Sequence, residues 1–180
     1  MNLPRTPSQT AGPFLSLAMR WPADGPYVVP EGTPGAIWIR GRVLDGAGDP
    51  VDDGVVESWQ PDADGQFAIA ATTGFRGFGR ATTGADGAWA LHTVKPGRIA
   101  DARGGLAAPY ISLAIFARGL LKQVWTRVYF DDEADANQAD STLRSIDPSR
   151  RGTLVAASTA DGYRIDVRLQ GQDETVFLDV

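Results

Sequence analysis

Hydrophobic positions along the chain fall into short runs that alternate with polar positions. The clearest run spans residues 163–170, where Tyr163, Ile165, Val167 and Leu169 share one face and polar side chains share the other. A period of two with one polar face is typical of a strand that packs on one side and meets solvent on the other. Other segments with strand character are residues 36–44, 55–59, 88–94, 110–117, 121–130 and 175–180.

Turn residues separate these segments, and helix signals are few. Asp-Gly pairs, which favour tight turns, occur six times. Residues 133–137 are compatible with a turn or two of helix, and Asp147 followed by Pro148 predicts a helix that runs to about residue 157. Short strands with closely spaced turns predict a mainly β fold, a β-sandwich of antiparallel or mixed sheets with long loops and one or two short helices.

Length and composition indicate one domain. The chain has 180 residues, 43% of them hydrophobic and 22% charged, which is enough for one sizeable core. Residues 1–35 are rich in Pro and Gly and predict an extended N-terminal arm, which leaves residues 36–180 for the sandwich domain. A net charge of −5 argues against nucleic-acid binding, and no apolar run is long enough for a membrane span. Without a signal-peptide pattern at the N-terminus, we expect a cytoplasmic protein.

Two residue counts narrow the chemistry available to this chain. It has no cysteine, which excludes disulfides, zinc–thiolate sites and thiol nucleophiles. It has one histidine, His92, which excludes any site that needs two imidazoles from one chain. His92 lies in a predicted strand without a nucleophile beside it, so a partly exposed strand residue is favoured over a catalytic one.

A set of short blocks extends over essentially the whole chain. The blocks are TPSQTAGPF at 6–14, VESWQPDADG at 56–65, GFGR at 77–80, HTVKPG at 92–97, FARG at 116–119, RVYFDDE at 127–133 and YRIDVRLQG at 163–171. In order and spacing they resemble the intradiol ring-cleavage dioxygenases. Within that family, the pattern is most similar to the alpha subunits that lack metal and pair with an iron-bearing beta subunit.

The resemblance implies a subunit of a hetero-oligomer of alpha and beta chains. Such an enzyme inserts both atoms of O2 into protocatechuate, a carboxylated catechol, and opens the ring between its two hydroxyls to give 3-carboxy-cis,cis-muconate. The family holds one ferric ion with two tyrosine phenolates, two histidines and a water. Anionic oxygen and imidazole ligands suit such an ion.

The residues at the four ligand positions of the family cannot hold that ion. The resemblance puts Phe67 and Ile99 at the two tyrosine positions, and Tyr110 and Ser112 at the two histidine positions. Phe67 and Ile99 have no donor atom, and one phenol with one hydroxyl is too few ligands. We therefore expect no metal ligand and no catalytic residue in this chain, with Fe(III) held by the beta subunit.

The resemblance also implies that this chain completes its partner's pocket. The positions carried over are Thr10, Gly12, Pro13, Phe14 and Arg118. The guanidinium of Arg118 suits a substrate carboxylate, with an interface or structural salt bridge as the alternative. For Thr10 the alternative is a plain turn hydrogen bond. For the whole chain the alternative is a non-catalytic β-sandwich binding module, against which the Pro/Gly-rich arm favours a subunit.

Overall fold

The computed structural model describes residues 7–10, 12, 14–19, 25–67, 75–101 and 104–179. In these residues a one-turn helix is followed by nine strands, and further helical turns lie between the sixth and seventh strands. The elements are α1 (Leu15–Ala18), β1 (Ala36–Leu44), β2 (Val55–Trp59), β3 (Phe78–Thr82), β4 (Ala88–Val94), β5 (Ile111–Phe116), β6 (Val124–Phe130), α2 (Ala134–Ala139), α3 (Ser141–Ser145), the 3-10 turn η1 (Arg151–Leu154), β7 (Val155–Thr159), β8 (Gly162–Arg164) and β9 (Val167–Arg168).

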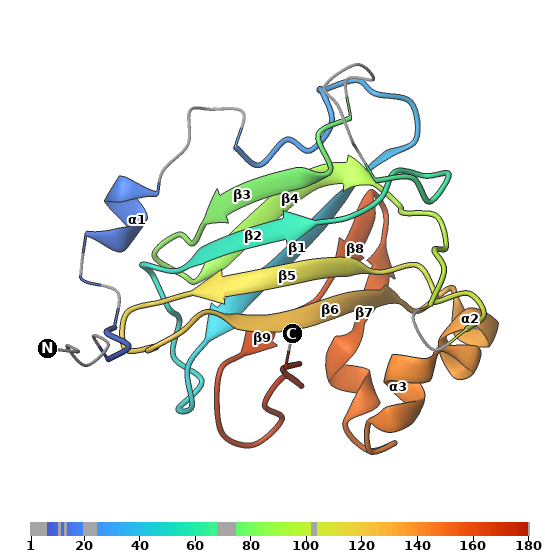
Figure 1. Cartoon of the computed structure of the whole chain (residues 1–180). Helices are drawn as coiled ribbons and strands as arrows, with labels where there is room; N and C mark the ends of the chain where they lie inside the picture. Colours follow the sequence, from blue (N-terminus) through green and yellow to red (C-terminus); the bar gives the residue numbers. More distant parts are fainter. Residues whose placement is uncertain are drawn as a thin grey trace, which may run out of the picture.

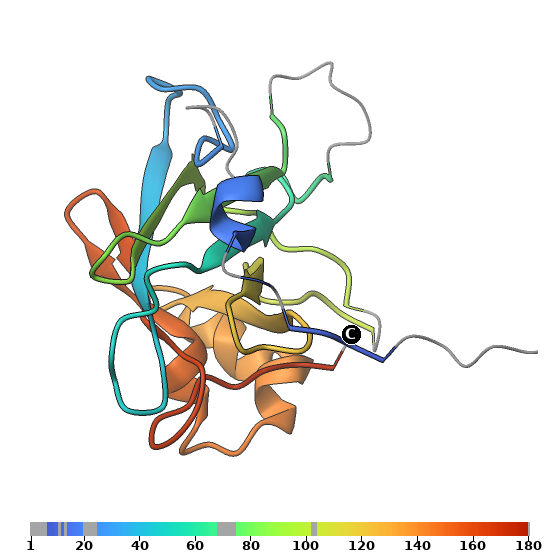
Figure 2. The ribbon, with the colours of Figure 1, turned by 90° about the vertical axis from the view of Figure 1, so that its left-hand side faces the viewer.

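The strands form a mixed β-sandwich. Their hydrogen-bonded order is β3-β2-β5-β6-β7-β8-β1-β4, with β9 paired to β1. Pairing is antiparallel within β3-β2-β5-β6 and parallel where β1 meets β8 and β9 and where β6 meets β7. This path folds over so that β3-β2-β5-β6 covers the layer containing β1, β4 and β8 (Figures 1 and 2). The predicted β-sandwich of mixed sheets is confirmed.

One apolar core fills the space between the layers. The side chains of β5 that point inward are those of Ile111, Leu113 and Ile115, at most 1% exposed. Because side chains alternate along a strand, Tyr110 and Ser112 lie on the opposite, outer face of β5. The core residues contributed by other elements include Ile39, Val43, Val56, Trp89, Leu91, Val128, Phe130, Tyr163, Ile165 and Val167.

A buried carboxylate joins the helical end of the sandwich to β6 and to the segment that leads into β5. Asp140 is 1% exposed and caps α3, because its Oδ1 accepts hydrogen bonds from the N–H groups of Thr142 and Leu143, both at 2.9 Å. Its Oδ2 accepts from the N–H of Ala108 at 3.0 Å, and the hydroxyl of Tyr129 donates to Oδ1 at 3.2 Å. The helices α2 and α3 therefore sit at the end of the sandwich away from α1 (Figure 1).

A second polar connection lies between the ends of β4 and β6. Lys95 Nζ is 2.9 Å from Asp132 Oδ1 and 2.7 Å from Glu133 Oε1, and the hydroxyl of Tyr163 donates to Asp132 Oδ2 at 2.9 Å. Burial alone would lower the pKa of Lys95, but the two acidic neighbours outweigh it and raise that pKa. Burial would likewise raise the pKa of Asp132, but hydrogen bonds from Lys95 and Tyr163 lower it.

Most predicted elements form, with four differences. The strands predicted at 36–44, 55–59 and 88–94 have these bounds, and α2 covers the expected short helix. The helix predicted from Asp147 to about residue 157 is wrong: η1 and β7 replace it, since β7 pairs with β6. Residues 163–170 are interrupted between β8 and β9, although their apolar face is buried as predicted, and β3 was not anticipated. Residues 175–179 form no assigned strand.

Part of the expected N-terminal arm packs against the core. Val28 and Val29 are 1% and 4% exposed, and the N–H of Val28 donates to the carbonyl of His92 at 2.8 Å. His92 is 8% exposed, packs against the rings of Tyr27 and Trp38 and places Nδ1 3.3 Å from the carbonyl of Val29. The histidine expected to be partly exposed is therefore buried under residues 27–29. None of the helices in the described part of the chain is long and apolar enough to cross a membrane.

Candidate functional site

Two of the residues expected to line a partner's pocket are brought together at one end of the sandwich. The hydroxyl oxygen of Thr10 accepts a hydrogen bond from the N–H of Gly119 at 2.8 Å. Gly119 has a φ of 92°, a conformation that glycine adopts at low cost, in the loop between β5 and β6. The N-terminal segment is thereby docked beside Arg118, although more than a hundred positions separate them in sequence.

Arg118 is held at its base but remains open to solvent. Its Nε lies 3.1 Å from Asp53 Oδ2, and 61% of the arginine side chain is exposed, against 18% of the aspartate. An arginine has five N–H donors, so this single contact leaves most of the guanidinium available to another acceptor. Arg118 therefore forms a structural salt bridge within its own chain, as the alternative interpretation predicts. The remaining N–H donors of the guanidinium are still enough to bind a carboxylate.

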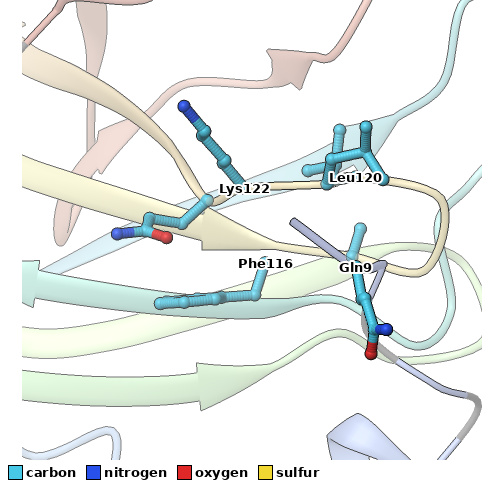
Figure 3. A pocket seen from close by; sticks show the side chains of 7 residues that line it. Gln9, Phe116, Leu120 and Lys122 are labelled. Carbon is cyan, nitrogen blue, oxygen red and sulfur yellow. The ribbon is translucent and has the colours of Figure 1, made fainter. Parts of the chain in front are cut away.

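A small pocket lies between the docked segment and the β5–β6 loop. It measures about 200 Å³ and is lined by Gln9, Phe116, Ala117, Leu120, Leu121, Lys122 and Gln123. Figure 3 shows Gln9 of the N-terminal segment beside Phe116 and Leu120, with Lys122 on the loop shortly before β6. The hollow adjoins Thr10 and Arg118 in sequence and carries one cation, one aromatic ring and two amides.

The other pocket-lining candidates lie further along the same segment. Phe14 is 72% exposed, and Leu17 on α1 is 56% exposed. A Cβ added at Gly12 would meet nothing within 4 Å, so nothing in the described part of this chain requires a glycine there. Pro13 lies outside the described residues. The apolar side chains of Phe14 and Leu17 thus face away from the core of their own chain.

The four positions that the family resemblance assigns to iron ligands lie at the other end of β5. Ser112 pairs with Trp59 of β2, and the ring of Phe67 stacks on Trp59 with centroids 6.2 Å apart. Tyr110 is two residues from Ser112 on the same outer face. The carbonyl of Ile99 accepts from the N–H of Ala107 at 2.9 Å, in the loop that leads to β5. Sequence positions spread over 46 residues are therefore brought to one region.

These side chains do not fit a ferric ion. Phe67 and Ile99 offer no donor atom, which leaves the phenol of Tyr110 and the hydroxyl of Ser112. The ring of Tyr110 is covered by the guanidinium of Arg127, whose central carbon lies 3.9 Å from the ring centroid. In the described part of the chain, no group of three or more His, Cys, Asp or Glu side chains is arranged to hold a metal ion.

Sequence reasoning missed three residues that shape these two regions. Asp53 belongs to one of the Asp-Gly pairs that predict tight turns, yet it contacts Arg118. Arg127 appeared only within a sequence block, and its place opposite Ser112 follows from strand register. Asp140 had a readable signal, since an Asp directly before Ser141 is a typical N-cap, but its bonds to Ala108 and Tyr129 are tertiary.

The two regions are separated by the length of a strand. Tyr110 immediately precedes β5, and Arg118 follows its last residue by two positions. A six-residue strand is roughly 20 Å long at about 3.3 Å per residue. Thr10 and Arg118 are therefore too far from Tyr110 and Ser112 to act on a common small molecule.

Sequence comparison finds relatives that match most or nearly all of this chain. A protocatechuate 3,4-dioxygenase alpha chain from Pseudomonas putida is 43% identical over 195 residues, covering 98% of this chain and 97% of the relative. A protocatechuate 3,4-dioxygenase beta chain from Burkholderia cepacia is 27% identical over 156 residues, covering 77% of this chain and 66% of the relative.

A solved structure and a family model also match this chain to dioxygenases. The dioxygenase domain of a dioxygenase–carbohydrate-binding protein fusion from Streptomyces sp. SirexAA-E superposes with a TM-score of 0.63 at 25% identity, covering 92% of this chain and 99% of that one. The family model described as Dioxygenase matches residues 24–171. As the resemblance to intradiol ring-cleavage dioxygenases predicts, this chain belongs to the dioxygenase family.

Proposed function

We propose that this chain is the alpha subunit of a protocatechuate 3,4-dioxygenase and completes the pocket of an iron-bearing beta subunit. The full-length similarity to an alpha chain supports the identity. One observation supports separate roles for the two subunits, with the iron in the beta subunit and Arg118 supplied by this chain. It is the distance along β5 between Arg118 and the former ligand positions Tyr110 and Ser112. Apart from its ion pair with Asp53, the guanidinium lies too far from these positions to act there, which supports a role at a site in another chain.

In this assignment the residues of the chain bind and orient the substrate and leave the chemistry to the partner. The exposed guanidinium of Arg118 would donate hydrogen bonds to the carboxylate of protocatechuate, and Asp53 would hold the arginine in place from behind. Thr10 would fix the arm that carries Gly12, Pro13 and Phe14 over the partner. Ring opening with O2 and Fe(III) belongs to the beta subunit, and no catalytic residue comes from this chain.

The environment of the complex follows from composition. A chain without cysteine gains nothing from an oxidising compartment, and we assign the complex to the cytoplasm. In domain terms, residues 1–35 supply the arm and residues 36–180 the sandwich that presents the loop with Arg118.

Co-expression with a beta subunit tests the proposal. The full chain purified alone is expected to be colourless, free of iron and without O2 uptake on protocatechuate. Purified with the beta subunit, it is expected to form a stable complex that contains iron and opens the ring. A coloured, iron-loaded and active preparation of the chain alone would overturn the proposal. A chain that neither binds the beta subunit nor changes its activity would support the binding module instead.

A further inference from the structure

A half-buried cation, Arg127, lies among the positions that the resemblance assigns to iron ligands, and the family assignment does not explain it. Arg127 on β6 is paired in register with Ser112, so both side chains leave the outer face of the sheet next to one another. Its guanidinium lies over the ring of Tyr110, with the central carbon 3.9 Å from the ring centroid. One positive charge therefore lies against two of the four former ligand positions.

The structure holds this charge in place from behind. Arg127 Nη1 donates to the hydroxyl of Thr142 at 3.0 Å and to that of Tyr129 at 3.3 Å. Tyr129 in turn donates to the buried carboxylate of Asp140, which ties the arrangement to the start of α3. Burial alone would lower the pKa of Arg127, but its bond to Tyr129 and the nearby phenols and carboxylate raise it. The guanidinium is thus fixed and permanently charged.

We propose that the guanidinium of Arg127 has taken over the position of the metal charge, so that its repulsion, and not ligand loss alone, closes this chain to metal ions. Two like charges a few ångströms apart on a partly buried sheet face repel strongly, because little water screens them. Restoring donors at positions 110 and 112 would therefore give weak metal binding as long as Arg127 remains. This inference rests on the placement of the ligand positions and is independent of the partner and substrate in the proposed function.

A two-histidine chelate in the full chain tests the inference. Tyr110→His with Ser112→His places two imidazoles on one face of β5, two residues apart, which is a chelating arrangement for Ni²⁺. The pair is compared in three backgrounds: Arg127 retained, Arg127→Gln, and Arg127→Lys as the matched control that keeps the charge. Ni²⁺ is titrated by calorimetry after thermal unfolding has shown that each variant is folded.

The expected result is Ni²⁺ binding at least about tenfold tighter in the Arg127→Gln background than with Arg127, with no comparable gain for Arg127→Lys. Equal affinities in all three backgrounds would overturn the inference. A gain in the lysine variant equal to that in the glutamine variant would also overturn it, because side-chain bulk and not charge would then be the obstacle.

A single substitution provides a second reading in case the pair disturbs folding. Ser112→His alone adds one imidazole opposite Arg127, and His92 is the only other histidine in the chain. Proton NMR titration is expected to give the new imidazole a pKa below the ordinary value of about 6.5 with Arg127 or Arg127→Lys, and a higher one with Arg127→Gln. The same pKa in all three backgrounds would contradict the proposed charge effect, and the His92 resonance serves as the internal control.

Discussion

The hydroxyl oxygen of Thr10 accepts a hydrogen bond from the N–H of Gly119 at 2.8 Å, across 109 positions of sequence. This bond fixes the N-terminal segment against the loop that carries Arg118. Both groups are exposed, so the bond contributes only about 0.5–1.5 kcal/mol. Its importance is positional, because it sets where the residues after Thr10 meet a partner.

Replacing Thr10 by Val removes the acceptor with little change in shape. We expect the kcat/KM for protocatechuate of the co-expressed complex to fall about threefold to tenfold, in line with the loss of one exposed hydrogen bond. Thr10→Ser keeps the hydroxyl and is expected to retain most of the activity. If Thr10→Ser loses as much as Thr10→Val, then the methyl group and not the bond to Gly119 matters.

Arg118→Ala should reduce binding of the carboxylated substrate selectively. Loss of a charge-assisted hydrogen bond costs roughly 1.5–3 kcal/mol, which is about 10- to 150-fold in kcat/KM for protocatechuate. Plain catechol, measured in parallel on the same complex, should lose far less, and iron content should not change.

The contact between Arg118 and Asp53 supplies the matched control for that experiment. Asp53→Asn removes the ion pair but keeps the guanidinium, so it should affect protocatechuate turnover much less than Arg118→Ala. Equal losses on both substrates, or a complex that dissociates, would identify Arg118 as a structural or interface residue.

Asp140→Ala should destabilise the fold strongly. The substitution leaves the N–H groups of Ala108, Thr142 and Leu143 without their buried acceptor, and each unsatisfied group costs about 1–3 kcal/mol. We expect the free energy of unfolding to fall by about 3 kcal/mol or more in urea titrations of the full chain. Asp135→Ala, at an exposed position of α2, is the control and should change it little. A similar small effect for Asp140→Ala would contradict its role as the connection between α3, Ala108 and β6.

Lys95→Met should remove a stabilising contribution that depends on pH. Because the pKa of Asp132 is lowered in the fold, its contribution is complete above the ordinary carboxyl pKa of about 4 and is lost as the pH falls further. Because the pKa of Lys95 is raised, its contribution is complete below its ordinary value of about 10.5 and is lost only at higher pH.

The substitution is therefore expected to cost about 0.5–1 kcal/mol between pH 5 and 9, the modest value of a solvent-screened pair. The difference from the unmodified chain should shrink below about pH 4. Lys122→Met makes the same chemical change at an exposed lysine and should show no such dependence. A difference that is constant from pH 3 to 9 would assign the effect to the aliphatic stem of Lys95.

Local sequence patterns were sufficient to predict the bounds of strands that pack one face on the core and expose the other. Residues 36–44 and 88–94 have the predicted bounds because burial of alternate side chains imposes a period of two on the sequence itself. The region after Asp147 shows the opposite case. Its capping signal is real, since the N–H of Ser149 donates to Asp147, but pairing of β7 with β6 outweighs the local preference for helix.

The sequence by itself determined the family and the sandwich, because these depend on which residue types occur and in what order. Only the tertiary structure decided that Asp53 meets Arg118, that Thr10 docks on Gly119 and that Arg127 covers Tyr110. The physical reason is that such contacts are set by strand register and loop closure between distant segments. No local pattern specifies which side chains those two factors will place within a few ångströms of each other.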